Sequence, residues 1–189
     1  MTRKKVAVLV GSLRKESISR MLAKALMEVA PDTLEFNFVE IGALPLYNSD
    51  LDTDNPPAEW TKFREALKSS DAYLFVTPEY NRTIPGALKN AIDVGSRPGG
   101  KSSWAGGKPG AIASQSQGPI SGFGANHHLR QTFVFLDIHP LQQPEVYIGN
   151  SGKLFDAAGK LTADDTREFL RKFMAAFASW VEQLAKKPT

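Results

Sequence analysis

The fold of this chain is decided by the stretch Val6-Ala7-Val8-Leu9-Val10-Gly11-Ser12-Leu13-Arg14-Lys15-Glu16-Ser17. Its first five residues form a continuous apolar run, which is typical of a strand buried on both faces of a parallel sheet. Gly11 allows a tight turn, and apolar residues then recur at helical spacing until Pro31 ends the helix. A buried strand, a glycine turn and a helix in this order predict the first unit of an α/β fold.

The same alternation continues along the rest of the chain. Further strands are predicted at 34–41, 72–77, 110–114 and 141–148, and further helices around 60–67, 88–95, 129–136 and 169–184. Strict alternation predicts a doubly wound parallel sheet with helices on both faces. Five strands favour the flavodoxin-like order 2-1-3-4-5. No repeat or linker divides the chain, so we expect one domain over residues 1–189.

This strand order predicts where a ligand binds. The chain reverses direction between the first and third strands, and ligands of such sheets bind beyond the carboxyl ends of the strands at that point. The segments expected there are Gly11–Ser19 and Pro78–Arg82. A third loop, Ser114-Gln115-Ser116-Gln117-Gly118-Pro119, follows the fourth strand and should flank the same crevice.

The first loop has the composition of a phosphate site. Ser12, Ser17 and Ser19 offer hydroxyl donors, Arg14 offers a charged fork, and the helix start offers free N–H groups. The alternative is a plain turn in which Ser17 is a helix N-cap. Neither a Walker loop nor a Gly-x-Gly-x-x-Gly motif is present, and the acids of a receiver domain are missing. Serine donors with a single arginine fit a terminal monophosphate, and these exclusions disfavour an ATP or GTP hydrolase and a dinucleotide Rossmann site.

The second and third loops predict the walls of a flat-ring site. Peptide groups after Pro78 can meet the polar edge of a ring, and Tyr80 can cover its face. Glu79 either contacts the ligand or pairs with Arg82 or Lys89. No Gly-x-Ser-x-Gly elbow or metal-ligand spacing occurs, which disfavours serine hydrolysis and a metal site. We expect structural or interface roles for the histidines at 127, 128 and 139.

Composition excludes several other classes of protein. The chain has no cysteine, so disulfides, thiolate catalysis and thiolate metal sites are excluded, and any redox chemistry needs a cofactor. The net charge of +3 and pI of about 9.1 come largely from the two ends, without a basic face for nucleic acid. No apolar run is long enough to span a bilayer, and the start lacks a signal-peptide cleavage site. We therefore expect a cytoplasmic protein without a membrane span.

Two segments resemble a known family. They are Val8-Leu9-Val10-Gly11-Ser12-Leu13-Arg14-Lys15-Glu16-Ser17 and the stretch from Thr77-Pro78-Glu79-Tyr80-Asn81 to Asp93. Both are similar to the NADPH-dependent FMN reductases, and most of all to the quinone and chromate reductases. The resemblance implies FMN contacts at Ser12, Arg14, Ser17, Ser19, Pro78, Glu79, Tyr80, Asn81, Ser114, Ser116, Gln117 and Gly118. Ser19 and Val94 depart from the family, in which Asn and an aromatic residue are common.

The resemblance also implies an activity. We expect NADPH or NADH to reduce the flavin, and a quinone, azo compound or oxyanion such as chromate to accept the electrons. Arg82 is a candidate substrate contact, and Arg82, Arg97 and Lys101 are candidates for a 2′-phosphate. The family implies a homodimer or homotetramer in which the loop Leu46–Pro57 borders a neighbour's site. Three alternatives are a reductase that releases reduced FMN to a monooxygenase, a flavodoxin-type electron carrier and a redox-silent binding module. The basic pI argues against the carrier, because such carriers are usually strongly acidic.

Overall fold

The computed structural model describes residues 2–98, 101–104 and 106–185 and contains a parallel sheet. Its central strands are β1 (Lys4–Val10), β3 (Ala72–Pro78) and β4 (Pro109–Gln115), with β2 (Leu34–Phe38) at one edge. The strand order β2-β1-β3-β4-β5 confirms the predicted 2-1-3-4-5 arrangement. Strands β3 and β4 are buried along their whole length, as a strand covered on both faces must be.

The edge beyond β4 differs from the prediction of one strand over residues 141–148. It is divided into β5 (His139–Pro140), which pairs with Pro109 and Gly110, and β6 (Val146–Ile148), which pairs with residues 113–115 of β4. Pro140 and Pro144 have no amide hydrogen to donate to a ladder, so pairing stops between the two short strands. The sheet therefore has six strands. The predicted order is unchanged, because β5 and β6 both pair with β4 at the position expected for the fifth strand.

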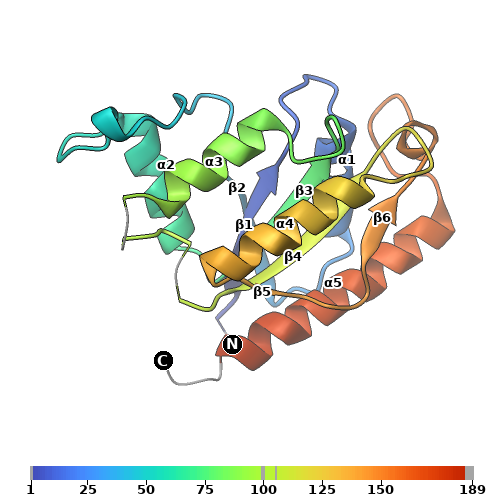
Figure 1. Ribbon diagram of the computed structural model, residues 1–189. Helices are drawn as coiled ribbons and strands as arrows, with labels where there is room; N and C mark the ends of the chain where they lie inside the picture. The colour runs from blue at the N-terminus through green and yellow to red at the C-terminus, as the bar shows by residue number, and fades with distance from the viewer. Residues whose placement is uncertain (1, 99–100, 105, 186–189) are drawn as a thin grey trace.

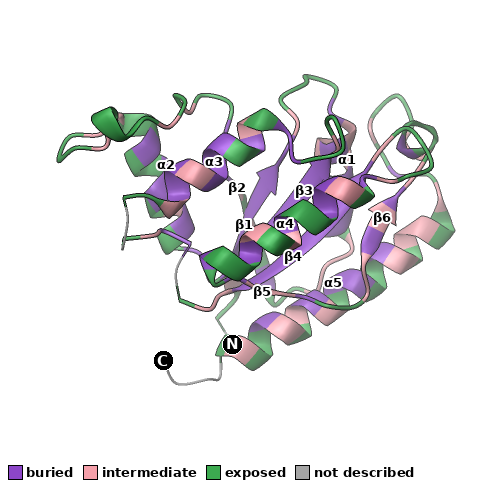
Figure 2. Ribbon diagram, viewed as in Figure 1, coloured by how far each residue is buried: buried purple, intermediate pink, exposed green. Residues whose placement is uncertain are grey.

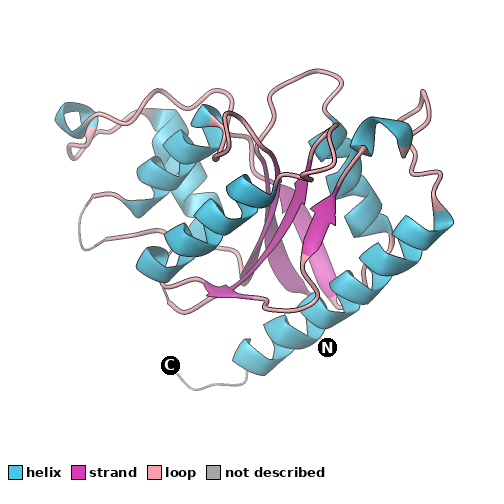
Figure 3. Cartoon of the chain, turned by 45° about the vertical axis from the view of Figure 1, so that its right-hand side comes forward, coloured by secondary structure: helices cyan, strands magenta, loops and turns pink. Residues whose placement is uncertain are grey.

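Helices cover both faces of the sheet. Helices α1 (Ile18–Glu28) and α5 (Asp164–Ala185) pack on one face, and α2 (Ala58–Lys68), α3 (Gly86–Ser96) and α4 (Phe123–Leu136) pack on the other. Short 3₁₀ turns lie at Ser49–Leu51 (η1) and Ser151–Lys153 (η2). Figure 1 labels these elements, and the turned view in Figure 3 shows the strands as a central layer between helices.

The alternation of side chains along β1 divides the core into two clusters. Val6, Val8 and Val10 pack toward α1 and α5, whereas Ala7 and Leu9 pack toward the other three helices. This two-sided burial, visible as the purple strands of Figure 2, leaves the middle of the sheet without access to solvent. Within the described ranges, no helix is both long and apolar enough to cross a bilayer.

The long loop at residues 42–57 projects beside α2 and carries η1 (Figure 1). Its base is anchored, because the amide of Tyr47 donates to Asn90 Oδ1 at 2.8 Å. Farther out, Arg64 of α2 makes two hydrogen bonds to Asp52, at 2.8 and 2.9 Å, and both side chains are nearly buried. The loop is therefore held against the body of the protein at two points.

Helix α3 is seated on a buried tryptophan. The indole of Trp104 is fully buried and donates to the carbonyl of Ile92 at 3.1 Å. Gly95 permits this contact, because a Cβ at that position would lie 2.4 Å from Trp104 Nε1. At the other end of α3, a Cβ on Gly86 would meet nothing within 4 Å.

We expect Gly95→Ala to lower the free energy of unfolding by about 1–2 kcal/mol, since overpacking outweighs the better helix propensity of alanine. Gly86→Ala, in the same helix, should be neutral or stabilising by up to about 1 kcal/mol. Denaturant unfolding of both variants measures the difference. Equal stabilities for the two variants would contradict the packing argument.

Candidate active site

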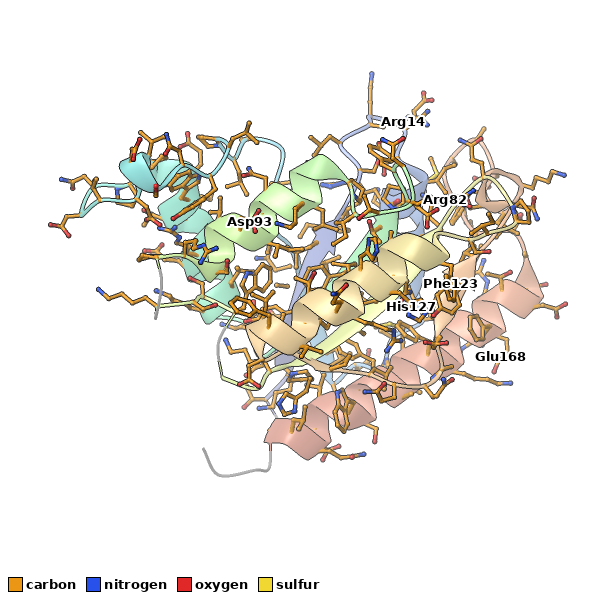
Figure 4. The ribbon with its side chains drawn as sticks, viewed as in Figure 1. Arg14, Arg82, Asp93, Phe123, His127 and Glu168 are labelled. Carbon is orange, nitrogen blue, oxygen red and sulfur yellow. The ribbon has the colours of Figure 1, made fainter. Side chains whose placement is uncertain are left out.

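Loops that follow β1, β3 and β4 meet at one edge of the sheet and line an open cavity of about 220 Å³. This is the predicted switch point, and Figure 4 shows Arg14 and Arg82 at this end of the molecule. The cavity is lined by Ser12, Arg14, Ile18, Pro78, Glu79, Tyr80, Gln115, Ser116 and Gln117. The structure therefore brings together residues from all three predicted loops.

The first loop presents a row of free backbone donors. The amide of Gly11 donates to Val76, but the amides of residues 12–19 have no hydrogen-bond partner within the part of the chain that the structure describes. Ser17 caps α1, since its hydroxyl accepts from the amide of Arg20 at 3.1 Å. The N-cap interpretation of Ser17 is thus correct, and it is compatible with an anion at the free N–H groups.

The second loop contains a tight turn. Tyr80 and Thr83 exchange two backbone hydrogen bonds, at 3.1 and 3.0 Å, across Asn81 and Arg82. Both intervening residues have positive φ, 51° and 65°, which is uncommon for residues other than glycine and costs conformational energy. The turn leaves the ring of Tyr80 47% exposed at the side of the cavity.

Glu79 links this loop to α4. Its side chain is only 8% exposed, and Oε2 accepts from the amide of Ala125 at 3.2 Å. Oε1 pairs with Arg82 at 3.3 Å, whereas Lys89 pairs with Asp93 instead. Because Gly122, the N-cap residue of α4, has no side chain to offer, Glu79 satisfies a donor at the start of that helix.

Gln115 lines the cavity although the predicted contacts did not include it. Its side chain is buried, with Nε2 donating to the hydroxyl of Ser19 at 2.8 Å and Oε1 accepting from Ser151 at 2.6 Å. Gln115 is the last residue of β4, beside the predicted Ser114. Its position at the end of a strand next to the switch point could have indicated from the sequence that it lines the site.

Of the predicted contacts in the third loop, Ser116 and Gln117 line the cavity, whereas Ser114 and Gly118, like Ser17, Ser19 and Asn81 of the other loops, do not. The hydroxyls of Ser19 and Ser114 are fully buried, and that of Ser114 donates to the carbonyls of Ser121 and Val146. The hydroxyl of Ser116 donates to the carbonyl of Gly118. The amides of Gln117 and Gly118 have no partner among the described residues, so they are available to a ligand. Asn81 and Arg82 lie on the turn beside the cavity.

The histidines engage neighbouring side chains. His127 pairs with the hydroxyl of Tyr147 at 3.0 Å and packs on Phe123 (Figure 4), while His128 Nδ1 lies 2.6 Å from the hydroxyl of Thr83. His139 lies next to Asp137. Over the described ranges, no group of three or more His, Cys, Asp or Glu residues has the arrangement of a metal site.

The candidates for a 2′-phosphate are separated by the structure. Arg82 is beside the cavity, but Arg97 and Lys101 follow the C-terminal end of α3. Since α3 begins next to the cavity and has 11 residues, its far end is about 16 Å away at 1.5 Å per residue. The structure does not bring Arg97 and Lys101 to the site.

This fold and these loops define a flavodoxin-like α/β protein whose first loop presents free backbone amides at the switch point. The family model of the NADPH-dependent FMN reductases matches residues 4–153, and the chain belongs to that family. FMN is therefore its cofactor and NAD(P)H its electron donor. Which residues contact the flavin stays a prediction.

Similar proteins cover nearly the whole chain. A quinone reductase of Pseudomonas putida is 59% identical over 177 residues, 94% of each chain. A 2-hydroxy-1,4-benzoquinone reductase of Burkholderia sp. is 48% identical and covers 94% of this chain and 96% of its own. The solved structure of FerB, a flavoenzyme NAD(P)H:(acceptor) oxidoreductase from Paracoccus denitrificans, has a TM-score of 0.88 and 41% identity, covering 95% and 98% of the two chains.

The residues at the site fit FMN. The free amides of residues 12–19 and the charge of Arg14 match a phosphate monoester. Pro78 and Tyr80 offer flat surfaces beside the cavity, and the free amides of Gln117 and Gly118 match the hydrogen-bonding edge of the ring.

We expect Glu79→Ala to lower the free energy of unfolding by about 1–3 kcal/mol, because it leaves the amide of Ala125 without an acceptor. Arg82→Ala removes only the exposed half of the Glu79 pair and should cost less than about 1 kcal/mol. Denaturant unfolding of the apoprotein measures both effects. An equal loss in the two variants would mean that the bond to Ala125 contributes nothing.

Proposed function

We propose that the chain is an FMN-dependent NAD(P)H:quinone oxidoreductase. The observation that carries the proposal is a loop of unpaired backbone amides next to an open cavity, at the point where the strand order reverses. Similarity to proteins named quinone reductase supports the choice of acceptor. The bound flavin supplies the redox chemistry, accepting hydride from the nicotinamide and passing electrons to the quinone.

The side chains and amides of this chain bind and orient. The amides of residues 12–19, with Arg14, hold the phosphate, and the turn at Asn81 fixes Tyr80 beside the ring. The amides of Gln117 and Gly118 would donate hydrogen bonds to the bound flavin and so stabilise negative charge on its ring. The proposal requires no side chain to act as a general acid.

The proposal extends to azo compounds and to oxyanions such as chromate. Arg14 and Arg82 are exposed cations at the cavity, so they attract anionic acceptors and the phosphates of the nicotinamide donor. Arg82 is 70% exposed and sits on the turn that carries Tyr80, which makes it the proposed substrate contact.

The proposal includes a homodimer or homotetramer. Val134 and Phe135 of α4 are 80% and 81% exposed, and adjacent apolar side chains with so much exposure are typical of a surface that another protein covers. The projecting loop at 42–57 adds exposed Leu46 and Leu51, together with the acidic Asp50 and Asp54. These charges complement the basic cavity mouth of a second copy, beside which we place this loop.

We expect the purified protein to bind FMN and to oxidise NAD(P)H when a quinone is present. Arg14→Ala should weaken FMN binding by about tenfold, the cost of one charge-assisted hydrogen bond. Arg171→Ala, which removes an exposed charge of α5, is the control and should leave the FMN affinity unchanged. Fluorescence titration of the apoprotein with FMN measures both.

A protein that binds no FMN, or whose NAD(P)H oxidation does not depend on the quinone, contradicts the proposed function. Turnover by the protein alone excludes a flavodoxin-type carrier. Gel filtration after turnover tests for a reductase that releases reduced FMN, since such an enzyme emerges without flavin.

We expect sedimentation to give a mass that is a multiple of the 20.7 kDa of the chain. The double variant Val134→Glu/Phe135→Glu should shift the protein toward the monomer, because burying two carboxylates in an interface is costly. Gln183→Glu on α5 is the control. A wild-type monomer at micromolar concentration contradicts this part of the proposal.

A further inference from the structure

A second groove lies on the other side of the phosphate loop from the flavin cavity. It has a volume of about 400 Å³ and lies at the carboxyl ends of β1 and β2. Ser12 and Arg14 line both the groove and the flavin cavity. The groove is therefore a neighbour of the flavin phosphate position and not a separate surface feature.

The groove combines an apolar base with positive charge. Phe38 and Ile41 contribute apolar surface, and the guanidinium of Arg20 lies 4.8 Å from the centre of the Phe38 ring. Lys15 and Arg14 add two exposed cations. Glu40 is the carboxylate among the lining residues, and it pairs with Arg20.

These groups match the chemistry of an adenosine phosphate. In dinucleotide-binding sheets, an acidic residue after the first βα unit binds the ribose hydroxyls, and a nearby arginine accommodates a 2′-phosphate. Glu40, which follows β2, and Arg20 offer these two groups here. A purine can pack on the apolar base beside the flat guanidinium of Arg20.

A third cavity, of about 340 Å³, shares lining residues with both the groove and the flavin cavity. Leu13 and Arg14 line it together with the groove, and Arg14 and Tyr80 line it together with the flavin cavity. A dinucleotide can therefore follow a path around Leu13 and Arg14 with one end beside Tyr80 and the other in the groove.

We propose that this groove is the subsite for the adenosine phosphate end of a dinucleotide whose other end reaches the flavin cavity beside Tyr80. The inference rests on the proposed function. NADPH is the favoured source, since the charges of Lys15 and Arg20 outweigh that of Glu40 and suit a 2′-phosphate, while Arg14 is engaged with the flavin phosphate. FAD is the alternative source, since it carries an adenosine phosphate joined to the phosphate of its FMN half.

The test uses the holoenzyme at saturating FMN with NADPH and NADH as alternative donors. Lys15→Glu should raise the KM for NADPH by about tenfold and that for NADH by much less, because the 2′-phosphate loses an attractive charge and gains a repulsive one. Glu40→Gln should act in the opposite direction and lower the KM for NADPH by about threefold. Lys24→Glu is the matched control, since Lys24 is an exposed lysine of α1 that does not line the groove.

Two further arms identify the source of the adenosine phosphate. In the wild type, 2′,5′-ADP should compete with NADPH, and Lys15→Glu should weaken this inhibition. Titration of the apoprotein with FMN and with FAD gives the ratio of the two flavin affinities. If Lys15→Glu changes this ratio but leaves the ratio of the KM values for NADPH and NADH unchanged, the groove is assigned to FAD. If neither ratio changes and 2′,5′-ADP does not compete, the inference is overturned. A wild type that binds no FMN, in contrast, overturns the proposed function itself.

Discussion

Burial of the sheet on both faces is the constraint on which the rest of this structure depends. Strands β3 and β4 have no exposed residue, and the apolar half of β1 is covered as well. Polar side chains can reach solvent only where these strands end, and in a parallel sheet all carboxyl ends share one edge. The loops after β1, β3 and β4 are therefore forced together, and their polar groups form the cavity.

The sequence predicted the parts that depend on local pattern. Continuous apolar runs specify buried strands, so the strand order and the meeting of the three loops followed from alternation alone. The split into β5 and β6 was not predicted. The apolar residues between 141 and 148 indicate one strand, but Pro144 interrupts the pairing between them.

Features that depend on tertiary packing were beyond the sequence. Gln115 is held by Ser19 and Ser151, which are distant in sequence and become neighbours only in the folded chain. The groove beside Arg20 is likewise formed by two strand ends and a helix. Arg97 was a poor candidate for a phosphate contact because the helix before it runs away from the loops. Helix direction could have indicated this before the structure was known.

Helix α4 contacts the second loop, which follows β3, and also carries the surface that we propose for self-association. Its first turns hold the loop by the bond from Ala125 to Glu79 and by the contact of His128 with Thr83. Gly124 also lets the helix approach closely, since a Cβ there would lie 2.6 Å from the carbonyl of Arg82. The strained turn at 81 and 82 persists because these contacts fix both of its sides. One helix thus carries both the contacts that hold this turn and, at its far end, the exposed Val134 and Phe135 of the surface that we propose for self-association.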